Sequence, residues 1–330
     1  MDKKLNELEM TFGPNRIRKN EPMSLHTTFK IGGPAKFYLN VEKIDDLVRA
    51  VKIAKKMNLP FFILGGGSNI LVSDKGFKGL VIKNNCRNFE IMMVSGNVKN
   101  KKVGINKALV SAESGAIMNQ LVRFTIEHGL SGLEYQLGLP GTVGGAVFMN
   151  SNFPKENSFV GDCVYQARLL TKEGEVKDVD NSYFHFGYDE SILQKTGEMI
   201  LSVVFKLSPE AKNVLWERGT NALEYRKKTQ PAKASAGCAF RNISMLEAIN
   251  IPTPDRITSV GYLIEKAGLK GKRIGDAVIS DMHANYILNA GHAKAEDVLK
   301  LINLIKGEIF KMFNVKINLE IKTIGIDTLN

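Results

Sequence analysis

The stretch Gly138-Leu139-Pro140-Gly141-Thr142-Val143-Gly144-Gly145-Ala146 decides how the rest of the chain is interpreted, together with Leu64-Gly65-Gly66-Gly67-Ser68-Asn69 upstream of it. Glycines at this density let the backbone take positive φ and approach a ligand closely, because no Cβ intervenes. Successive N–H groups in such loops form concave anion sites. Two such loops therefore predict an extended, phosphate-containing cofactor held from two sides. The alternative for either cluster alone is a tight turn between strands.

Neither loop has the spacing of the common nucleotide-binding motifs. Ile70 stands where a third glycine would complete the dinucleotide pattern, and no Gly-Lys-Ser/Thr follows either cluster. A dinucleotide bound here would therefore not be held by a Rossmann loop.

Composition limits the class of protein. A chain of 330 residues suits two or three domains. The first residues contain no apolar segment typical of a signal peptide, and no apolar run is long enough to span a bilayer. Cys86, Cys163 and Cys238 are widely spaced, which argues against a disulfide framework or a zinc site and for the cytoplasm.

The net charge of +11 has two interpretations. Basic runs such as 52–56 and 99–102 could contact nucleic acid, but no aromatic residues are interleaved with them. The alternative is a set of solvated faces whose diffuse positive field attracts small anionic ligands. The sequence therefore predicts no nucleic-acid partner.

Apolar periodicity predicts alternating helices and strands. Helices are expected over 47–57, 117–126, where Gly129 caps the end, and 298–309. Strands are expected at 61–64, 70–72, 80–82, 109–111, 167–171, 176–179, 200–207 and 315–322, with a polar loop over 97–102 and a polar, helix-prone boundary over 208–217.

A third unusual stretch, Ser235-Ala236-Gly237-Cys238-Ala239-Phe240-Arg241-Asn242, brings a thiol, a guanidinium and an amide together on a tight backbone. The alternative for Cys238 is a buried small apolar residue. Glu320 on the last strand and His283 are further polar candidates, whose alternatives are a solvated carboxylate and a structural histidine. No His, Cys or carboxylate spacing predicts a metal site.

These stretches, with Phe186-Gly187-Tyr188 and Leu319-Glu320-Ile321-Lys322-Thr323-Ile324-Gly325, stand in the order of the MurB family, the UDP-N-acetylenolpyruvoylglucosamine reductases. The resemblance runs from about Thr27 to Gly325. The short link between Leu207 and Arg226 is similar to the shorter of the family's two types. Five ordered motifs make the resemblance specific.

The resemblance implies an α+β architecture. Its parts are a vanillyl-alcohol-oxidase-like (PCMH-type) FAD-binding fold in two lobes and a C-terminal substrate-binding α+β domain. The implied ranges are 1–83 for the first lobe, joined by a strand at 316–330, 84–207 for the second lobe, and 208–315 for the substrate domain.

FAD is implied as a non-covalent cofactor and NADPH as the hydride donor. The implied FAD-binding residues are those of the two glycine stretches: Gly65, Gly66, Gly67, Ser68, Asn69, Gly138, Pro140, Gly141, Thr142, Gly144 and Gly145.

The implied activity is the reduction of UDP-N-acetylglucosamine enolpyruvate to UDP-N-acetylmuramate in peptidoglycan synthesis. Cys238 takes the position of the proton donor and Glu320 that of a carboxylate beside the substrate. Substrate contacts are implied for Asn69, Tyr188, Arg226, Gly237, Asn242 and His283. The chain departs from the family at Asp189, which stands where a catalytic Arg is expected, and at Thr229, where Lys is frequent.

Three functions therefore remain open. The first is an active, cytoplasmic, NADPH-dependent reductase that acts on a small-molecule UDP-sugar, with no membrane and no obligate protein partner. The second is a catalytically impaired homologue that binds FAD or a UDP-sugar, because of Asp189. The third is another oxidase of the same fold with a tethered flavin, although neither glycine loop contains the His or Cys that such a tether uses.

Overall fold

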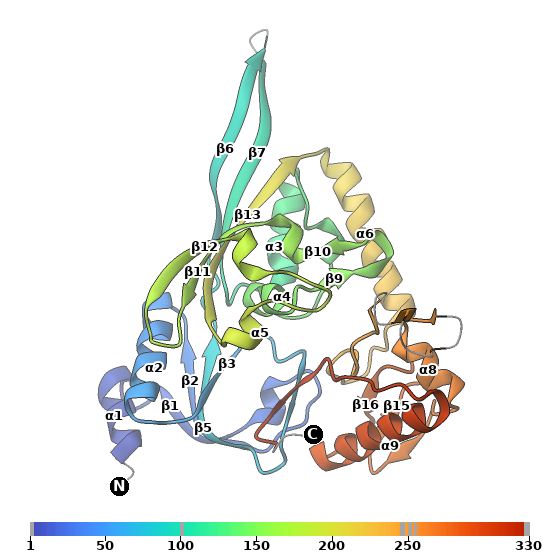
Figure 1. Ribbon diagram of the computed structural model, residues 1–330. Coiled ribbons are helices and arrows are strands. Elements are labelled where there is room, and N and C mark those ends of the chain that lie inside the picture. The colour runs from blue at the N-terminus through green and yellow to red at the C-terminus, as the bar shows by residue number, and fades with distance from the viewer. Residues whose placement is uncertain (1–2, 100–101, 245–247, 250–252, 254–255, 327–330) are drawn as a thin grey trace. The chain divides into compact units, whose positions relative to one another are not determined.

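The computed structural model describes the whole chain except residues 1–2, 100–101, 245–247, 250–252, 254–255 and 327–330 (Figure 1). The chain forms two compact units whose segments alternate along the sequence. Unit 1 comprises Met1–Arg16, Leu39–Gly66 and Ile82–Lys228; unit 2 comprises Ile17–Tyr38, Gly67–Val81 and Thr229–Asn330. The chain passes between the units within β2 (Pro34–Val41) and β5 (Phe77–Asn84). The domain ranges predicted from the resemblance divide the chain differently and stay a prediction.

Unit 1 is built on a six-stranded antiparallel sheet. Five strands have the order β12-β11-β13-β7-β6, and β8 pairs with β13. The bounds are β6 (Phe89–Lys99), β7 (Lys102–Glu113), β8 (Leu130–Ser131), β11 (Val164–Leu170), β12 (Val176–Asp180) and β13 (Met199–Pro209). Its core gathers apolar side chains from these strands and from α3 (Met118–Glu127), α4 (Val143–Met149) and α6 (Lys212–Thr229).

Unit 1 also contains two N-terminal helices and several short helices and strands. They are α1 (Lys3–Phe12), α2 (Ile44–Lys56), β3 (Phe61–Leu64), η2 (Glu134–Gln136), β9 (Asn152–Phe153), η3 (Pro154–Glu156), β10 (Ser158–Phe159), η4 (Val160–Cys163), η5 (Asn181–Phe184) and α5 (Leu193–Thr196). α2 buries Leu47, Val51 and Ala54 at helical spacing, and it has acidic residues in its first turn and basic ones in its last, as the helix dipole favours. The predicted helix at this position is confirmed.

The polar segment 97–102 is not a loop, contrary to the prediction. β6 and β7 form a long hairpin that extends beyond the rest of the sheet (Figure 1), and its register pairs Asn97 with Gly104 and Lys99 with Lys102. A two-stranded ladder satisfies the hydrogen bonds of backbone N–H and C=O groups whatever the polarity of the side chains. Polar composition alone therefore did not distinguish a hairpin from a loop. Residues 100–101 of the predicted loop lie outside the described residues.

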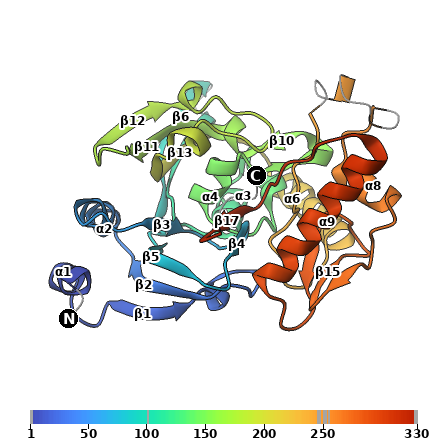
Figure 2. The ribbon, with the colours of Figure 1, turned by 60° about the horizontal axis from the view of Figure 1, so that its bottom comes forward.

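Unit 2 contains a three-stranded antiparallel sheet, β14 (Arg273–Ile274), β15 (Ala277–Ile279) and β16 (Ile287–Asn289), against which α9 (Ala295–Phe313) packs (Figure 2). β1 (Ile17–Pro22), η1 (Met23–His26), β4 (Ile70–Val72) and α8 (Val260–Lys266) belong to the same unit. Its core includes Val298, Ile302, Ile305 and Ile309, so the predicted long helix is confirmed.

The last strand is shorter than predicted. β17 covers Lys322–Ile324 and pairs in parallel with β4, with Lys322 opposite Ile70. The predicted strand at 315–322 alternates buried and exposed side chains, with Val315 and Ile317 in the core, but it forms only an isolated bridge from Leu319 to Phe240 before β17 begins. The period-two pattern therefore indicates an extended segment that packs on the core, but it does not show that this segment pairs with a neighbouring strand.

Candidate active site

The two glycine stretches meet inside unit 1. A Cβ on Gly66 would lie 2.5 Å from Cα of Gly141, and one on Gly65 would lie 2.5 Å from Oγ1 of Thr142. Cβ atoms do not approach backbone atoms this closely. Only glycine therefore fits at position 66 while the two loops keep their present separation. The predicted pair of loops therefore forms one continuous surface of backbone.

Backbone hydrogen bonds at Gly141 and Val143 hold the second glycine stretch in place. The N–H of Met118 donates to Gly141 O at 3.1 Å, and the N–H of Val143 donates to Ala116 O at 2.9 Å. Thr142 is the N-cap of α4, and its Oγ1 accepts the N–H of Gly145 at 3.4 Å.

The glycines of this stretch serve different purposes. Gly138 has φ +84°, and its added Cβ would lie 2.6 Å from Leu223 of α6; at Gly144 the Cβ would lie 2.9 Å from Cβ of Ser114. Both are packing positions. A Cβ on Gly145 has only Thr142 Oγ1 nearby, at 3.7 Å. Gly145 therefore has room beside it that Gly138 and Gly144 lack.

This surface fits a diphosphate. At Gly65, Gly66 and Gly141 it is backbone free of Cβ atoms, so a phosphate can approach the main chain closely. The N–H groups at the start of α4 are used within the unit, because those of Val143, Gly144 and Gly145 donate to Ala116 O, Ser114 O and Thr142 Oγ1. Residues 64–66 and 138–146 include no acidic residue. The pyrophosphate of FAD is thus compatible with the residues that are present.

The end of the first glycine stretch lies in unit 2, beside the cysteine stretch. Gly67 has φ +67°, and its carbonyl accepts the N–H of Thr28 at 3.0 Å. The hydroxyl of Thr28 donates to Ser235 O at 2.7 Å. Thr28 thereby connects the loop before Asn69 to the stretch that carries Cys238.

Glu320 and Cys238 are also brought together in unit 2. The N–H of Glu320 donates to Ala239 O at 3.0 Å, next to Cys238. The amide of Asn69 donates to Glu320 O at 3.5 Å, and the N–H of Lys322 donates to Asn69 O at 3.0 Å. Hydrogen bonds therefore join Asn69, Glu320 and the residue next to Cys238, which come from three distant motifs.

Asn285 fixes the cysteine stretch, a role that sequence reasoning missed. Its side chain accepts the N–H of Phe240 at 2.9 Å and donates to Phe240 O at 2.7 Å, while its carbonyl accepts the N–H of Ala239 at 2.7 Å. Asn285 is buried. The only signal in the sequence is its place in the polar run His283-Ala284-Asn285-Tyr286.

His283 belongs to the same turn as Asn285. Its Nδ1 accepts the N–H of Asn285 at 3.3 Å, and its ring lies 5.0 Å from that of Tyr286, which forms a bridge with Cys238. Burial lowers the pKa of His283, so the neutral ring is favoured. With Nδ1 accepting, that ring carries its proton on Nε2 and can donate it in a hydrogen bond.

Gly237 and Asn242 flank Cys238 differently. Gly237 has φ +81° with no heavy atom within 4 Å of an added Cβ, so the backbone beside the thiol is open in unit 2. The side-chain oxygen of Asn242 accepts the N–H of Val260 at 3.1 Å, at the start of α8. One end of that amide is therefore used to position a helix.

Of the other predicted residues, Ser68 lies in unit 2, and Pro140, Tyr188, Asp189 and Arg226 lie in unit 1. Asp189 has φ +52°, and its Oδ1 accepts a hydrogen bond of 2.9 Å from Asn152 Nδ2. Tyr188 packs edge-on against Phe159, with ring centroids 6.5 Å apart. Arg226 is buried in the last turn of α6, where its guanidinium lies 5.2 Å from the ring of Phe153 and donates to Tyr135 O at 3.4 Å.

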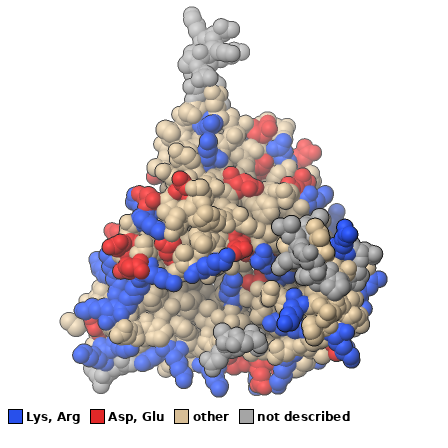
Figure 3. All heavy atoms as spheres, in the orientation of Figure 1, with Lys and Arg blue, Asp and Glu red and all other residues tan. Residues whose placement is uncertain are grey.

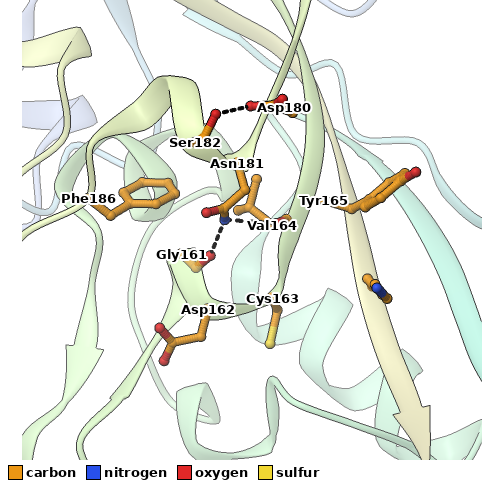
Figure 4. Close-up of a pocket in the computed structure, with 10 residues that line it drawn as sticks. Gly161, Asp162, Cys163, Val164, Tyr165, Asp180, Asn181, Ser182 and Phe186 are labelled. Carbon is orange, nitrogen blue, oxygen red and sulfur yellow. Dashed lines mark hydrogen bonds between the residues drawn. The ribbon is translucent and has the colours of Figure 1, made fainter.

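A pocket of about 460 Å³ in unit 1 has no predicted site residue in its lining (Figure 4). Its polar groups are paired with one another: Asn181 donates to Gly161 O and Val164 O, and Ser182 donates to Asp180. Burial raises the pKa of Cys163 to about 12, so this thiol stays protonated. Nothing in the lining therefore points to chemistry.

Basic and acidic side chains are interspersed on the face of the molecule shown in Figure 3. Within the described residues, no group of three or more His, Cys, Asp or Glu side chains could hold a metal ion. No helix there is long and apolar enough to cross a membrane.

Comparison with known families assigns the class of protein. Residues 35–180 match the FAD binding domain family, and residues 230–324 match the C-terminal domain of UDP-N-acetylenolpyruvoylglucosamine reductase. The chain is a flavin-dependent oxidoreductase with the PCMH-type FAD-binding fold, and the predicted fold class and FAD are confirmed.

The relatives narrow the class to one family. A UDP-N-acetylenolpyruvoylglucosamine reductase of Bacillus pumilus is 36% identical over 94% of both chains, and one of Alkaliphilus oremlandii is 36% identical over 93% of this chain and 92% of its own. The crystal structure of the reductase MurB from Thermus caldophilus is similar with a TM-score of 0.70 and 31% identity, over 93% of this chain and 99% of that one. The chain belongs to the UDP-N-acetylenolpyruvoylglucosamine reductase family, as the motifs predicted.

Proposed function

We propose that the chain reduces UDP-N-acetylglucosamine enolpyruvate to UDP-N-acetylmuramate for peptidoglycan synthesis in the cytoplasm, with non-covalent FAD and with NADPH as the hydride donor. Its relatives over most of its length are named for this reduction. The observation that carries the proposal is the cluster in unit 2, where Glu320 is hydrogen-bonded to Ala239, the residue after Cys238, and to the side-chain amide of Asn69.

The substrate's chemistry explains the residue types of this cluster. Its vinyl group is conjugated to a carboxylate and can accept, at its terminal carbon, a hydride that FAD would supply when bound. Negative charge then develops on the neighbouring carbon and into the carboxylate, so the protein must provide a proton and polar groups beside the growing charge.

Cys238 is the proton donor in this proposal. A thiol is a weak acid whose proton can pass from sulfur to the carbanionic carbon. The open backbone at Gly237 leaves the substrate room beside it, and Asn285 prevents the stretch from shifting. The proton that leaves the sulfur returns from solvent after turnover.

The other residues bind and orient the substrate. Neutral His283 offers an Nε2–H donor within the same turn, and the Glu320 backbone is fixed next to Cys238. In unit 1, Gly65, Gly66, Gly141 and Thr142 would hold the cofactor diphosphate, and Arg226 supplies a buried cation. Tyr188, Gly237 and Asn242 complete the proposed substrate contacts.

One observation favours a second candidate, a catalytically impaired homologue that retains FAD and UDP-sugar binding. Asp189 places a carboxylate where the family has an Arg, and its Oδ1 is engaged by Asn152. Without that Arg, the developing charge would have one fewer preorganised partner.

Stopped-flow absorbance of the bound flavin separates the two candidates. For an active reductase, NADPH bleaches the flavin, and addition of the enolpyruvyl substrate restores its colour with formation of UDP-N-acetylmuramate. A protein that bleaches with NADPH and binds substrate without recovering its colour is the impaired homologue. Denaturation should release the yellow flavin from the chain; colour that stays with the polypeptide contradicts a non-covalent cofactor.

A further inference from the structure

Lys83 lies at the junction of the two glycine stretches in unit 1. It is half-buried near the end of β5, and its ammonium group donates to the carbonyl oxygen of Gly65. An added Cβ on Gly65 would clash with Thr142, and an added Cβ on Gly66 would clash with Gly141. The amine is therefore one hydrogen bond away from the surface that fits a diphosphate.

The end of β5 is also fastened to the second glycine stretch. The side chain of Asn84 donates to Ser114 Oγ at 2.8 Å, and Ser114 O accepts the N–H of Gly144 at 2.8 Å. Lys83 thus belongs to a strand end that is bonded to both loops, through Gly65 on one side and through Ser114 on the other.

The charge of Lys83 has no anionic partner among the described residues. Its hydrogen bond there goes to a neutral carbonyl, although an ammonium group has three N–H donors. Burial and the neighbouring Arg87 guanidinium lower the pKa of Lys83. Buried charges are ordinarily paired, so this cation lacks a counterion that a bound anion would supply.

We propose that Lys83 is a cofactor-binding residue, whose ammonium group offsets the charge of the FAD diphosphate and positions the peptide between Gly65 and Gly66. In a trans peptide the C=O and the next N–H point in opposite directions. A Gly65 carbonyl held by Lys83 therefore turns the Gly66 N–H away from the amine and fixes its direction. This inference rests on the FAD assignment and adds a cation to the glycine loops.

The test is FAD affinity, measured by fluorescence titration of the flavin-free protein. Lys83→Met removes the charge at similar length, and Lys83→Gln removes the charge but keeps an N–H donor. Both should raise the FAD Kd about 10- to 100-fold, as expected for a unit charge at roughly 6–8 Å in a partly buried site. Lys83→Arg should stay within about threefold of wild type.

Two further readouts distinguish this role from a structural one. The melting temperature of flavin-free Lys83→Met should equal or exceed that of wild type, because a half-buried cation without a carboxylate is removed. Its FAD Kd should also depend less on NaCl concentration than that of wild type. Lys78→Met is the matched control, because Lys78 is exposed on the same strand, and it should leave all three quantities unchanged.

An FAD Kd within twofold of wild type in Lys83→Met and Lys83→Gln overturns the proposal, as does an equal loss of stability with and without FAD. Failure of the wild-type protein itself to bind FAD would instead overturn the cofactor assignment on which the proposal rests.

Discussion

Asn152 donates a hydrogen bond of 2.9 Å to the carboxylate of Asp189, the residue that the family resemblance predicts to stand in place of a catalytic Arg. Gln194 also donates to the Asp189 backbone oxygen, at 2.9 Å. The residue has φ +52°, a conformation that Asp tolerates better than most side chains. Asp189 is therefore built into its turn and is not a loosely held surface residue.

Asp189→Arg should raise the rate of flavin reoxidation by the enolpyruvyl substrate, without changing flavin reduction by NADPH. A preorganised cation beside the developing charge is worth roughly 10²- to 10³-fold in rate. Stopped-flow measurement of the two half-reactions tests this.

Asp189→Asn is the control for the Asp189→Arg experiment, because it removes the negative charge and adds no cation. Its gain should be smaller than that of Asp189→Arg. If Asp189→Arg slows reoxidation, Asp189 has a role of its own in this chain.

Cys238→Ser should keep substantial activity, because a hydroxyl at the same position can still deliver a proton. Cys238→Ala should slow the oxidative half-reaction by about 10²- to 10⁴-fold, the usual contribution of a positioned acid, while NADPH still bleaches the flavin. Ala at Cys163 is the matched control, since that thiol lies in unit 1 and donates to Gly132 O. Normal turnover by Cys238→Ala would leave Cys238 as a packing residue.

The sequence predicted the order of elements well where local chemistry decides them. The buried positions of α2 and the positive φ of Gly129 after α3 followed from periodicity and capping. The hairpin at 97–102 and the shortened last strand could not be predicted, because long-range pairing decides both. The hydrogen bond from Asn69 to Glu320 joins residues 251 positions apart and could not be predicted either.

The supporting residues of the site were harder to predict than its motif residues. Asn285 acts through three hydrogen bonds to the cysteine stretch, and Lys83 acts through one carbonyl of the glycine loop. Neither residue belongs to a sequence motif that would indicate its role. Asn152 was also missed, because its partner Asp189 is distant in sequence.

Gly66→Ala should purify without flavin. Its added Cβ would lie 2.5 Å from Cα of Gly141, so the two loops must separate and the surface for the diphosphate is lost. Gly141→Ala should behave similarly, because Gly141 has φ +115°. The measurement is the ratio of flavin to protein absorbance, with circular dichroism to check folding. Full flavin retention in both variants would remove these loops from the cofactor site.

Two helix glycines should respond oppositely to alanine. Gly307 in α9 has no heavy atom within 4 Å of an added Cβ, so Gly307→Ala should stabilise the protein by about 0.5–1 kcal/mol. At Gly219 in α6 the Cβ would lie 3.2 Å from Glu134 O, and Gly219→Ala should destabilise the protein. Urea denaturation of both variants tests this contrast, and equal shifts in the same direction contradict it.

A buried ion pair in unit 1 should make the stability of the protein sensitive to acid. Glu198 is buried in unit 1, where its carboxylate pairs with Lys177 at 2.6 Å and accepts the hydroxyl of Tyr183 at 2.7 Å. Burial alone would raise the pKa of Glu198, but the hydrogen bonds from Lys177, Tyr183 and Thr196 outweigh it and lower the pKa below its ordinary value. The folded protein therefore holds this proton less tightly than the unfolded chain.

The sign of the pH effect follows from that lowered pKa. The stabilisation is fully present above the unfolded value of about 4.3 and is lost as the pH falls through the folded value. Glu198→Gln should therefore lower the melting temperature at pH 7, and the difference from wild type should shrink as the pH approaches 3. Glu190 is the matched control, because its ion pair with Lys195 is more exposed than that of Glu198, and Glu190→Gln should change little. A Glu198→Gln deficit that stays constant across this range would mean that the pair contributes packing and not charge.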